Sequence, residues 1–237
     1  MSTYRATDTY VEVGRSHRLT VDGTRPIGEL TTLVTAACDR VERAVHSEVL
    51  VVRLGGGAEP AGWPGCTDVH QVSRWEKAVR RLERVTTATV GVASGGCGTP
   101  ALEVLLALDY RIATADFRLT AARDDRLPWP GMAMHRLVNQ IGLSRARQVL
   151  LGGSAVSAER AVAYGLVDEI AEEAEDAVRR AVHAFGALPG AELAVRRQLL
   201  LEATTSSFED ALGAHLAACD RELRRRGRLG DATGEVA

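Results

Sequence analysis

The sequence predicts one α/β domain that is followed by a helical C-terminal extension. Short apolar runs that suit buried strands, Val49–Leu54 and Ala88–Ala93, alternate with amphipathic helical patterns, which is typical of a largely parallel sheet. A length of 237 residues, 46% of them hydrophobic and 25% charged, fits one sizeable domain with an appendage. From Glu172 onward every pattern is helical, so the sheet is expected to end before that point.

The first third of the chain reads as two short strands, a helix, a buried strand and a second helix. The helix follows Pro26, and its apolar residues recur at helical spacing, so one face packs on the core. Val49–Leu54 is β-branched and ends at three glycines, which indicates a strand of a buried sheet. The expected elements are strands at Tyr10–Val13 and Leu19–Val21, a loop at Ala58–Val69 and a helix at Ser73–Leu82.

A strand, a glycine turn and a short helix form the centre of the predicted domain. Ala88–Ala93 is small and β-branched, and Ala101–Leu108 is apolar all round except at Glu103. A helix that is apolar all round is buried. Glu103 therefore lies either at a solvent-facing mouth near the positive end of the helix dipole or in a desolvated pocket. A pocket would raise its pKa towards that of a working acid or base.

The remaining elements of the domain are strands and helices separated by one irregular stretch. Ser157 is a plausible N-cap and Gly165 a C′ residue for the last of these helices. The predicted elements are strands at Tyr110–Thr114, Phe117–Thr120 and Leu166–Ile170, an irregular stretch at Ala121–Gly131, and helices at Met132–Ile141, Ser144–Leu151 and Ser157–Tyr164. The core domain is placed at residues 10–186 and a helical oligomerisation region at 187–230, with disorder after about Gly227.

Composition excludes several classes of function. The formal net charge is −2 and no broad basic field is present, so nucleic acid is not an expected partner. The four cysteines show no C-x-x-C pairing, and neither a metal site nor a disulfide framework is indicated. The polar N-terminus is unlike an export signal, and no run approaches the ~20 apolar residues of a membrane span. We expect a cytoplasmic protein that binds no membrane.

A series of motifs, met in order between Val49 and Ile170, resembles the enoyl-CoA hydratase/isomerase (crotonase) superfamily. The segments that carry the resemblance are Gly91–Asp109, Tyr110–Asp116, Trp129–Gly131, Leu150–Ala161 and Gly165–Val167. It implies a crotonase-like (ClpP/crotonase) spiral of ββα units. Two further segments, Trp75–Glu83 and Trp129–Leu137, are similar to the small crotonase-like enzymes of 3,5-dihydroxyphenylglycine biosynthesis, which work beside a type III polyketide synthase that makes 3,5-dihydroxyphenylacetyl-CoA.

The resemblance implies a lyase that hydrates, dehydrates or isomerises an acyl-CoA or polyketide-derived thioester in antibiotic biosynthesis. CoA would enter as part of the substrate, and no other cofactor is expected. The C-terminal helices resemble the family's trimerisation element, so a homotrimer or hexamer is implied, with a type III polyketide synthase as a possible partner. The alternative is a catalytically reduced subunit that enhances such a synthase by binding it or its product.

In the family, two backbone N–H groups bind the thioester carbonyl oxygen and a glutamate moves the proton. The resemblance places the N–H of Thr67 as the first donor and matches Glu103 to the catalytic glutamate. The second donor belongs to a glycine three residues earlier, but this position is Pro100, which has no N–H. Thr99 or Gly98 would have to supply that donor from a displaced turn.

The second acid of many family hydratases is also altered. Its position is taken by Arg123, so Asp124 and Asp125 are candidates after a shift in register; the alternative is that they belong to a plain charged loop. Flanking loops are expected to bring Cys66, His70 and Trp129 to the acyl pocket. For Trp129, and for Trp63 in the first loop, core packing is the competing role.

Two other motifs compete for the glycine turn. Gly96–Ala101 fits the G-x-G-x-x-A dinucleotide fingerprint, with Asp116 about 20 residues on. Its helix is short, however, and a proline lies inside the supposed phosphate turn. Ser94 and Cys97 occupy a strand-to-helix turn, a position that can activate a nucleophile. Val92 breaks the G-x-S-x-G pattern, however, and a small buried thiol is the simpler role for the cysteine.

Overall fold

The computed structural model describes residues 10–13, 16–44, 49–56, 63–65, 67–121, 128–152 and 154–234. The chain divides into two compact units, Met1–Gly190 and Ala191–Ala237. In the described part of the chain, no helix is long and apolar enough to cross a membrane. The first unit holds all of the strands listed below, and the second consists of helices.

The first unit is built on a six-stranded sheet in which β1 and β2 are antiparallel and every other neighbouring pair is parallel. In sheet order the strands are β1 (Tyr10–Val13), β2 (Ser16–Asp22), β3 (Val49–Gly55), β4 (Ala88–Ala93), β6 (Tyr110–Thr114) and β9 (Glu169–Ala171). All residues of β4 are buried, as its small and β-branched sequence predicts. The largely parallel sheet of the sequence prediction is confirmed.

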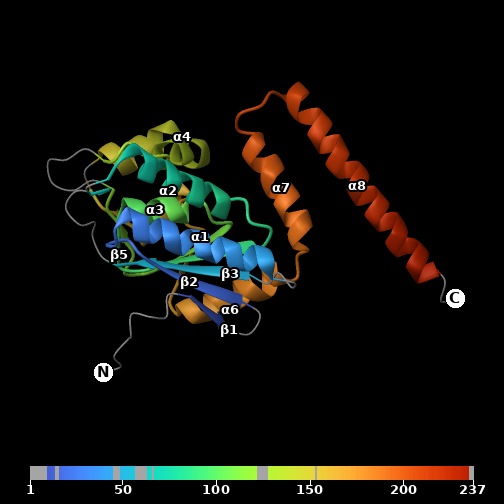
Figure 1. The fold of residues 1–237 in the computed structure, drawn as a ribbon, viewed down its shortest axis with the longest axis horizontal. Coiled ribbons are helices and arrows are strands. Elements are labelled where there is room, and N and C mark those ends of the chain that lie inside the picture. The colour runs from blue at the N-terminus through green and yellow to red at the C-terminus, as the bar shows by residue number, and fades with distance from the viewer. Residues whose placement is uncertain are drawn as a thin grey trace. The chain divides into compact units, whose positions relative to one another are not determined.

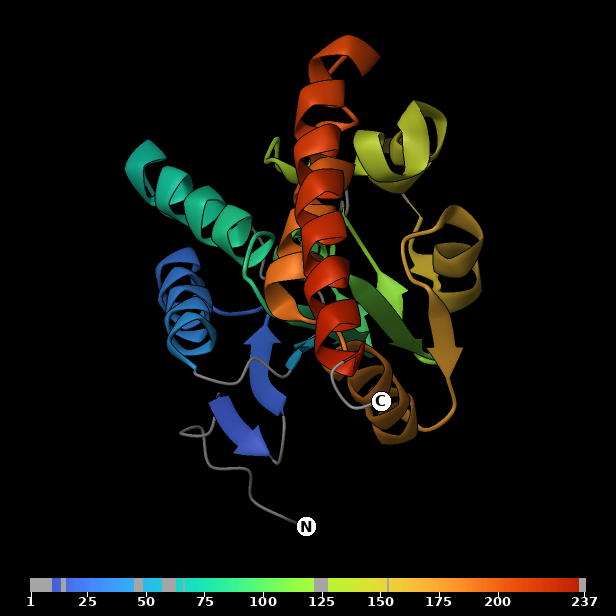
Figure 2. The same cartoon turned by 90° about the vertical axis from the view of Figure 1, so that its right-hand side faces the viewer.

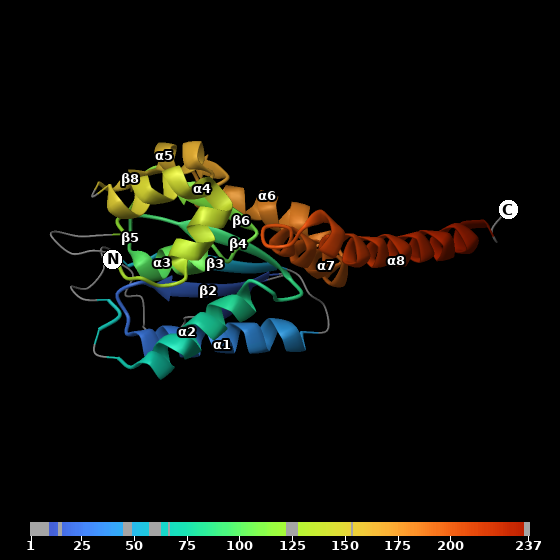
Figure 3. The same ribbon diagram turned by 90° about the horizontal axis from the view of Figure 1, so that it is seen from above.

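Helices cover both faces of this sheet. Figure 1 shows α6 on one side of the strands and α1, α2 and α3 on the other, with α4 beyond them. In Figure 3, seen from above, α1 and α2 again lie on one side of the strands and α6 on the other. Figure 2 shows α1 and α2 side by side. The bounds are α1 (Ile27–Arg43), α2 (Val69–Leu82), α3 (Thr99–Leu105), α4 (Ala133–Leu151), α5 (Ala158–Tyr164) and α6 (Ala174–Gly186).

A second, three-stranded sheet follows the turn after β4. Its strands, in the order β5-β7-β8, are β5 (Gly96–Cys97), β7 (Arg118–Leu119) and β8 (Val156–Ser157). Neither β5 nor β8 was predicted, because two-residue strands leave no periodic pattern. Strand β5 leads directly into α3, so this small sheet fixes the place where that helix starts.

Several predicted boundaries are wrong for identifiable reasons. Helix α2 starts at Val69, four residues before Ser73, because the Asp68 carboxylate caps it by accepting a hydrogen bond from the Gln71 N–H at 2.8 Å. Helix α3 runs from Thr99 to Leu105 and not from Ala101 to Leu108, since its N-cap is Gly98. Both helices therefore begin closer to their preceding loops than the apolar spacing alone indicated.

In the C-terminal half of the domain one predicted boundary differs and two other predictions are confirmed. The two helices expected at Met132–Ile141 and Ser144–Leu151 are confirmed as two parts of α4, which meet at the non-helical Gly142, where φ is +79°. Strand β9 is shifted towards the C-terminus relative to the expected Leu166–Ile170. The caps predicted for α5 are confirmed: the Ser157 hydroxyl accepts from the Arg160 N–H, and Gly165 is left-handed.

The second unit is a pair of antiparallel helices, α7 (Gly190–Glu202) and α8 (Phe208–Gly234). The expected disorder after about Gly227 is wrong, because α8 continues to Gly234. Ion pairs between Glu222 and both Arg225 and Arg226, three and four residues on, favour helix in this charged segment. Large apolar side chains of α8 are exposed at Phe208, Leu212, Leu216 and Leu223.

The loop from β4 through α3 to β6 is closed by hydrogen bonds between Thr89 and Asp109. The Asp109 carboxylate accepts from the Thr89 N–H at 2.9 Å and from its hydroxyl at 3.0 Å, and the Asp109 N–H donates to the same hydroxyl at 2.9 Å. Because Thr89 is buried, these bonds pin both ends of the segment that carries the turn and α3.

We predict that Asp109→Ala lowers the free energy of unfolding by about 1–3 kcal/mol, because it leaves the buried Thr89 donors without their acceptor. Urea unfolding followed by circular dichroism measures the change. Asp109→Asn retains an acceptor oxygen and is expected to lose less. Equal stability of the alanine variant and the wild type would show that the Thr89–Asp109 contact does not stabilise the loop.

Candidate functional site

The carboxyl group of Glu103 lies in the interior of the first unit. Glu103 is 0% exposed, and every other residue of α3 is buried as well. The chain reaches this position through Gly95, whose φ of +58° permits the turn between β4 and β5. Of the two alternatives left by the sequence, a solvent-facing mouth is excluded, and Glu103 is buried and desolvated.

The two oxygens of Glu103 have different surroundings. The indole Nε1 of Trp75, on α2, donates a hydrogen bond to Oε2. Oε1 is buried and has no hydrogen-bond partner among the described residues. It lies against Gly131, just before α4, where the Cβ of any other residue would collide with it. One oxygen is therefore fixed, and the other lies in a space that only glycine leaves open.

A buried arginine and two more glutamates lie next to this pair. Arg136 of α4 contacts the Glu76 carboxylate at 3.4 Å and the Glu83 carboxylate at 3.3 Å, both from α2. The other oxygen of Glu76 accepts from the Met132 N–H at 3.1 Å, at the start of α4. Both oxygens of Glu76 are therefore engaged, whereas Glu103 retains an unpaired oxygen. This difference marks Glu103 as the carboxyl available for chemistry.

Burial and, to a lesser extent, the nearby Glu76 carboxylate raise the pKa of Glu103 to about 8. Three groups lower this pKa: the Trp75 indole, the Arg136 guanidinium and the backbone N–H of Ala133, which favours the charged form. Desolvation is the largest effect, so the carboxyl is mostly protonated at neutral pH and titrates only slightly above it. A carboxyl with such a pKa can both give and accept a proton near pH 7.

Comparisons with known proteins identify the family of the chain. The family model of enoyl-CoA hydratase/isomerase matches residues 66–224. The chain belongs to the enoyl-CoA hydratase/isomerase family. A relative named enoyl-CoA hydratase, from Amycolatopsis orientalis, is 43% identical over 208 residues, which cover 87% of this chain and 95% of the relative.

Solved structures show that the fold is crotonase-like. An enoyl-CoA hydratase from a Polaromonas species superposes with a TM-score of 0.79 at 19% identity, with 94% of each chain covered. An enoyl-CoA hydratase/isomerase from Marinobacter aquaeolei gives a TM-score of 0.77 at 16% identity and covers 92% of each chain. The predicted fold class is therefore confirmed.

The residues that the crotonase motif places at the thioester carbonyl lie at the starts of two helices. Thr67 is half-buried just before α2, and its hydroxyl donates to the Gln71 side-chain oxygen at 2.5 Å. Pro100 is buried in the first turn of α3, where helical N–H groups have no partner within the helix, so proline costs the helix no hydrogen bond. The neighbouring Thr99 hydroxyl donates to the Ala121 carbonyl at 3.4 Å.

Other predicted site residues are only partly located. Cys66, Asp124 and Asp125 lie outside the described residues, and their roles stay predictions. His70 is exposed in the first turn of α2. Trp129 is half-buried beside Gly131 and therefore lies close to the Glu103 carboxyl.

Trp75 and Trp129 lie near Glu103, and the third tryptophan, Trp63, contacts Trp75. The ring of Trp63 meets that of Trp75 edge to face, with centroids 6.1 Å apart and planes at 76°. Trp63 also packs against the main core, so the core-packing role is correct for it. Sequence analysis missed Trp75 as a site residue, although a buried tryptophan on an amphipathic helix needs a partner for its N–H.

The competing motifs do not form sites. Gly96 and Cys97 belong to strand β5, and burial raises the pKa of the Cys97 thiol to about 12, so it is inert at neutral pH. The Thr114 hydroxyl and the Gly95 N–H bond to Asp116 and lower its pKa. This acid therefore secures the turn and is not presented to a dinucleotide. Among the described residues, no cluster of acids, histidines and cysteines is suited to a metal.

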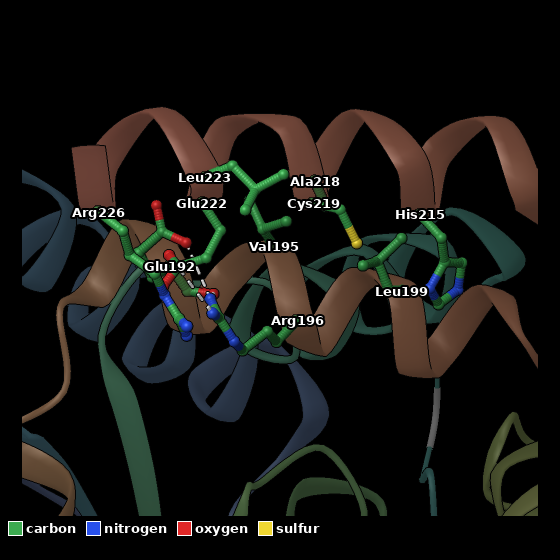
Figure 4. A pocket seen from close by; sticks show the side chains of 10 residues that line it. All are labelled: Glu192, Val195, Arg196, Leu199, His215, Ala218, Cys219, Glu222, Leu223 and Arg226. Carbon is green, nitrogen blue, oxygen red and sulfur yellow. Dashed lines mark hydrogen bonds and ion pairs between the residues drawn. The ribbon is translucent and has the colours of Figure 1, made fainter. Parts of the chain in front are cut away.

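A hollow of about 360 Å³ lies within the second unit, between α7 and α8. Figure 4 shows an apolar centre with carboxylates and guanidinium groups at one end, where Arg196 lies 3.7 Å from Glu222. Its lining side chains are Glu192, Val195, Arg196, Leu199, His215, Ala218, Cys219, Glu222, Leu223 and Arg226. It contains none of the residues expected at the crotonase site.

The raised pKa of Glu103 predicts a loss of stability with pH. Its pKa rises from an ordinary 4.5 to about 8 on folding, so the folded protein binds the proton more tightly. This stabilisation is complete below about pH 4.5 and is lost progressively as the pH rises through about 8. Glu103→Gln stays neutral, so the free energy of unfolding of the wild type relative to this variant should fall by up to about 5 kcal/mol across that window.

Urea unfolding of both proteins at pH 5, 6.5 and 8 measures this difference. Glu29→Gln, in the exposed first turn of α1, is the matched control and should parallel the wild type. Parallel pH curves for the wild type and Glu103→Gln would contradict a buried neutral carboxyl.

Proposed function

We propose that the protein is an acyl-CoA thioester hydratase/dehydratase or isomerase in which Glu103 moves the proton next to the thioester carbonyl. Membership of the family supports an enzyme of the lyase or isomerase type. The observation that carries the proposal is the Glu103 carboxyl, which is buried and half-satisfied and has a pKa of about 8.

The chemistry follows from the acidity of the carbon beside a thioester. When the Glu103 carboxylate takes that proton on its free oxygen, the bonding electrons pass to the carbonyl oxygen as an enolate. Backbone donors at Thr67 and at the start of α3 would stabilise this charge. Return of the proton at another carbon gives the isomer, and loss of a β-hydroxyl as water gives the enoyl thioester.

CoA is part of the substrate in this scheme. No other cofactor is needed, because hydration, dehydration and isomerisation require no external oxidant or reductant. Asp124 or Asp125 would supply a second acid where a β-hydroxyl leaves. We assign Cys66, His70 and Trp129 to the acyl pocket, with Trp129 best supported by its position next to Gly131.

We predict that Glu103→Gln reduces proton exchange at the acyl α-carbon by about 10²–10⁴-fold, because the amide cannot accept the proton. Incorporation of deuterium into a simple acyl-CoA in heavy water, followed by mass spectrometry, measures it. The wild-type kcat/KM should rise with pH and level off above about 8, since the ionised carboxyl is the abstracting form. Full exchange in Glu103→Gln would place the base elsewhere.

We further propose that the thioester comes from a type III polyketide synthase and that the product is 3,5-dihydroxyphenylacetyl-CoA. The segments Trp75–Glu83 and Trp129–Leu137 support this assignment, because they are the ones that resemble the dihydroxyphenylglycine enzymes and they supply the surroundings of Glu103. The exposed apolar residues of α8 support assembly into a homotrimer or hexamer.

A second candidate is a catalytically reduced subunit that enhances the synthase by binding it or its product. Pro100 favours this alternative, because it withholds one carbonyl donor, and a single donor of this kind contributes about 2.7–4 kcal/mol in an evolved site.

Mass-spectrometric product analysis of a synthase reaction, with and without this protein, separates the two functions. For an enzyme we expect a new product whose formation is lost with Glu103→Gln, because the amide cannot move the proton. For a helper subunit, the yield would increase without a change of product, and the increase would survive the substitution.

A further inference from the structure

We propose that Trp75 is a positioning residue that holds Glu103 by Oε2 and thereby makes Oε1 the oxygen that carries and exchanges the proton. This role deepens the proposed function and rests on it for its kinetic consequences alone. The observation behind the proposal is the hydrogen bond between the buried side chains of Trp75 on α2 and Glu103 on α3.

The chemistry of the indole explains why the two oxygens differ. An indole N–H is a donor only and does not titrate in the physiological range. An oxygen that accepts from it is a poor place for a second hydrogen, so the proton of the neutral acid is directed to the other oxygen. That oxygen, Oε1, has no partner among the described residues and lies against Gly131.

The orientation of the indole is itself fixed. Trp75 is 1% exposed on α2, and Trp63 meets its ring edge to face. The helix is held at its start by the Asp68 cap and along its length by the ion pairs from Glu76 and Glu83 to Arg136. The clamp on Glu103 is therefore part of a rigid helix and not of a mobile loop.

Helix α2 links the proposed carbonyl donor to the residue that positions the proton-transfer group. Thr67, the candidate carbonyl donor, directly precedes the cap of α2, and Trp75 lies about two turns further on. The charged groups near Glu103 are the Glu76 carboxylate on α2 and the Arg136 guanidinium on α4. Glu76 and Arg136 form an ion pair with each other, and Trp75 is the side chain that donates a hydrogen bond to the Glu103 carboxylate.

A direct test follows the indole resonances of the full-length wild-type protein by ¹⁵N NMR from pH 6 to 10. Three indole signals are expected, and spectra of Trp63→Phe, Trp75→Phe and Trp129→Phe assign them. The Trp75 signal should titrate with the midpoint of Glu103, near pH 8, and should stop titrating in Glu103→Gln. A Trp75 signal that does not move between pH 6 and 10 overturns the proposal.

Kinetics test the consequence for proton transfer. Trp75→Phe retains an aromatic ring but no donor, so the midpoint of the kcat/KM profile should rise by about one pH unit. The kcat for α-proton exchange should fall on the order of 10- to 100-fold with KM little changed, because the carboxyl loses its orientation. A variant that loses kcat with an unshifted midpoint would show a structural role and overturn the proposal.

The two tests separate this inference from the proposed function. An indole signal that titrates with Glu103 in a protein without activity on thioesters supports the clamp and refutes the enzyme. Activity that depends on Glu103 but is indifferent to Trp75→Phe supports the enzyme and refutes the clamp.

Discussion

The hydrogen bond from Trp75 to Glu103 is the contact on which the arrangement of the site depends. A carboxyl group taken out of water is tolerated when it is neutral or when its charge is balanced, and here neither condition is fully met. The Trp75 indole, the nearby Arg136 and the backbone N–H of Ala133 favour the charged form, while burial opposes it more strongly. The result is a group whose two protonation states lie close in free energy near neutral pH, which general acid–base chemistry requires.

The fold maintains this balance by placing neighbouring charges near Glu103 without bonding them to it. Arg136 is committed to Glu76 and Glu83, and the start of α4 is committed to Glu76. A full ion pair from Arg136 would hold Glu103 as a permanent carboxylate with a low pKa. The glutamates of α2 therefore prevent the arginine from neutralising the site, and they also tie α2 to α4 around it.

The sequence predicted the parts of this site that depend on local pattern. These parts are strand β4, the glycine turn and the single acid on an apolar helix. Each could be predicted because its pattern lies within a few adjacent residues. The partners of Glu103 are not, because Trp75 is 28 residues away and the contacts of Arg136 span 53 and 60 residues. Such pairs depend on how the helices pack against one another, and this packing leaves no local periodic pattern in a single sequence.

The state of Glu103 also bears on the choice between enzyme and helper. A glutamine at position 103 would accept the same hydrogen bond from Trp75 through its amide oxygen and would carry no ionisation penalty. A subunit that only binds a partner or product therefore gains nothing from a carboxyl here and loses stability as the pH rises. Pro100 would remove one donor from the proposed carbonyl site, but it leaves the Glu103 carboxyl and its hydrogen bond from Trp75 unchanged. The ionisation penalty of Glu103 therefore favours the proposed enzyme over the proposed helper subunit.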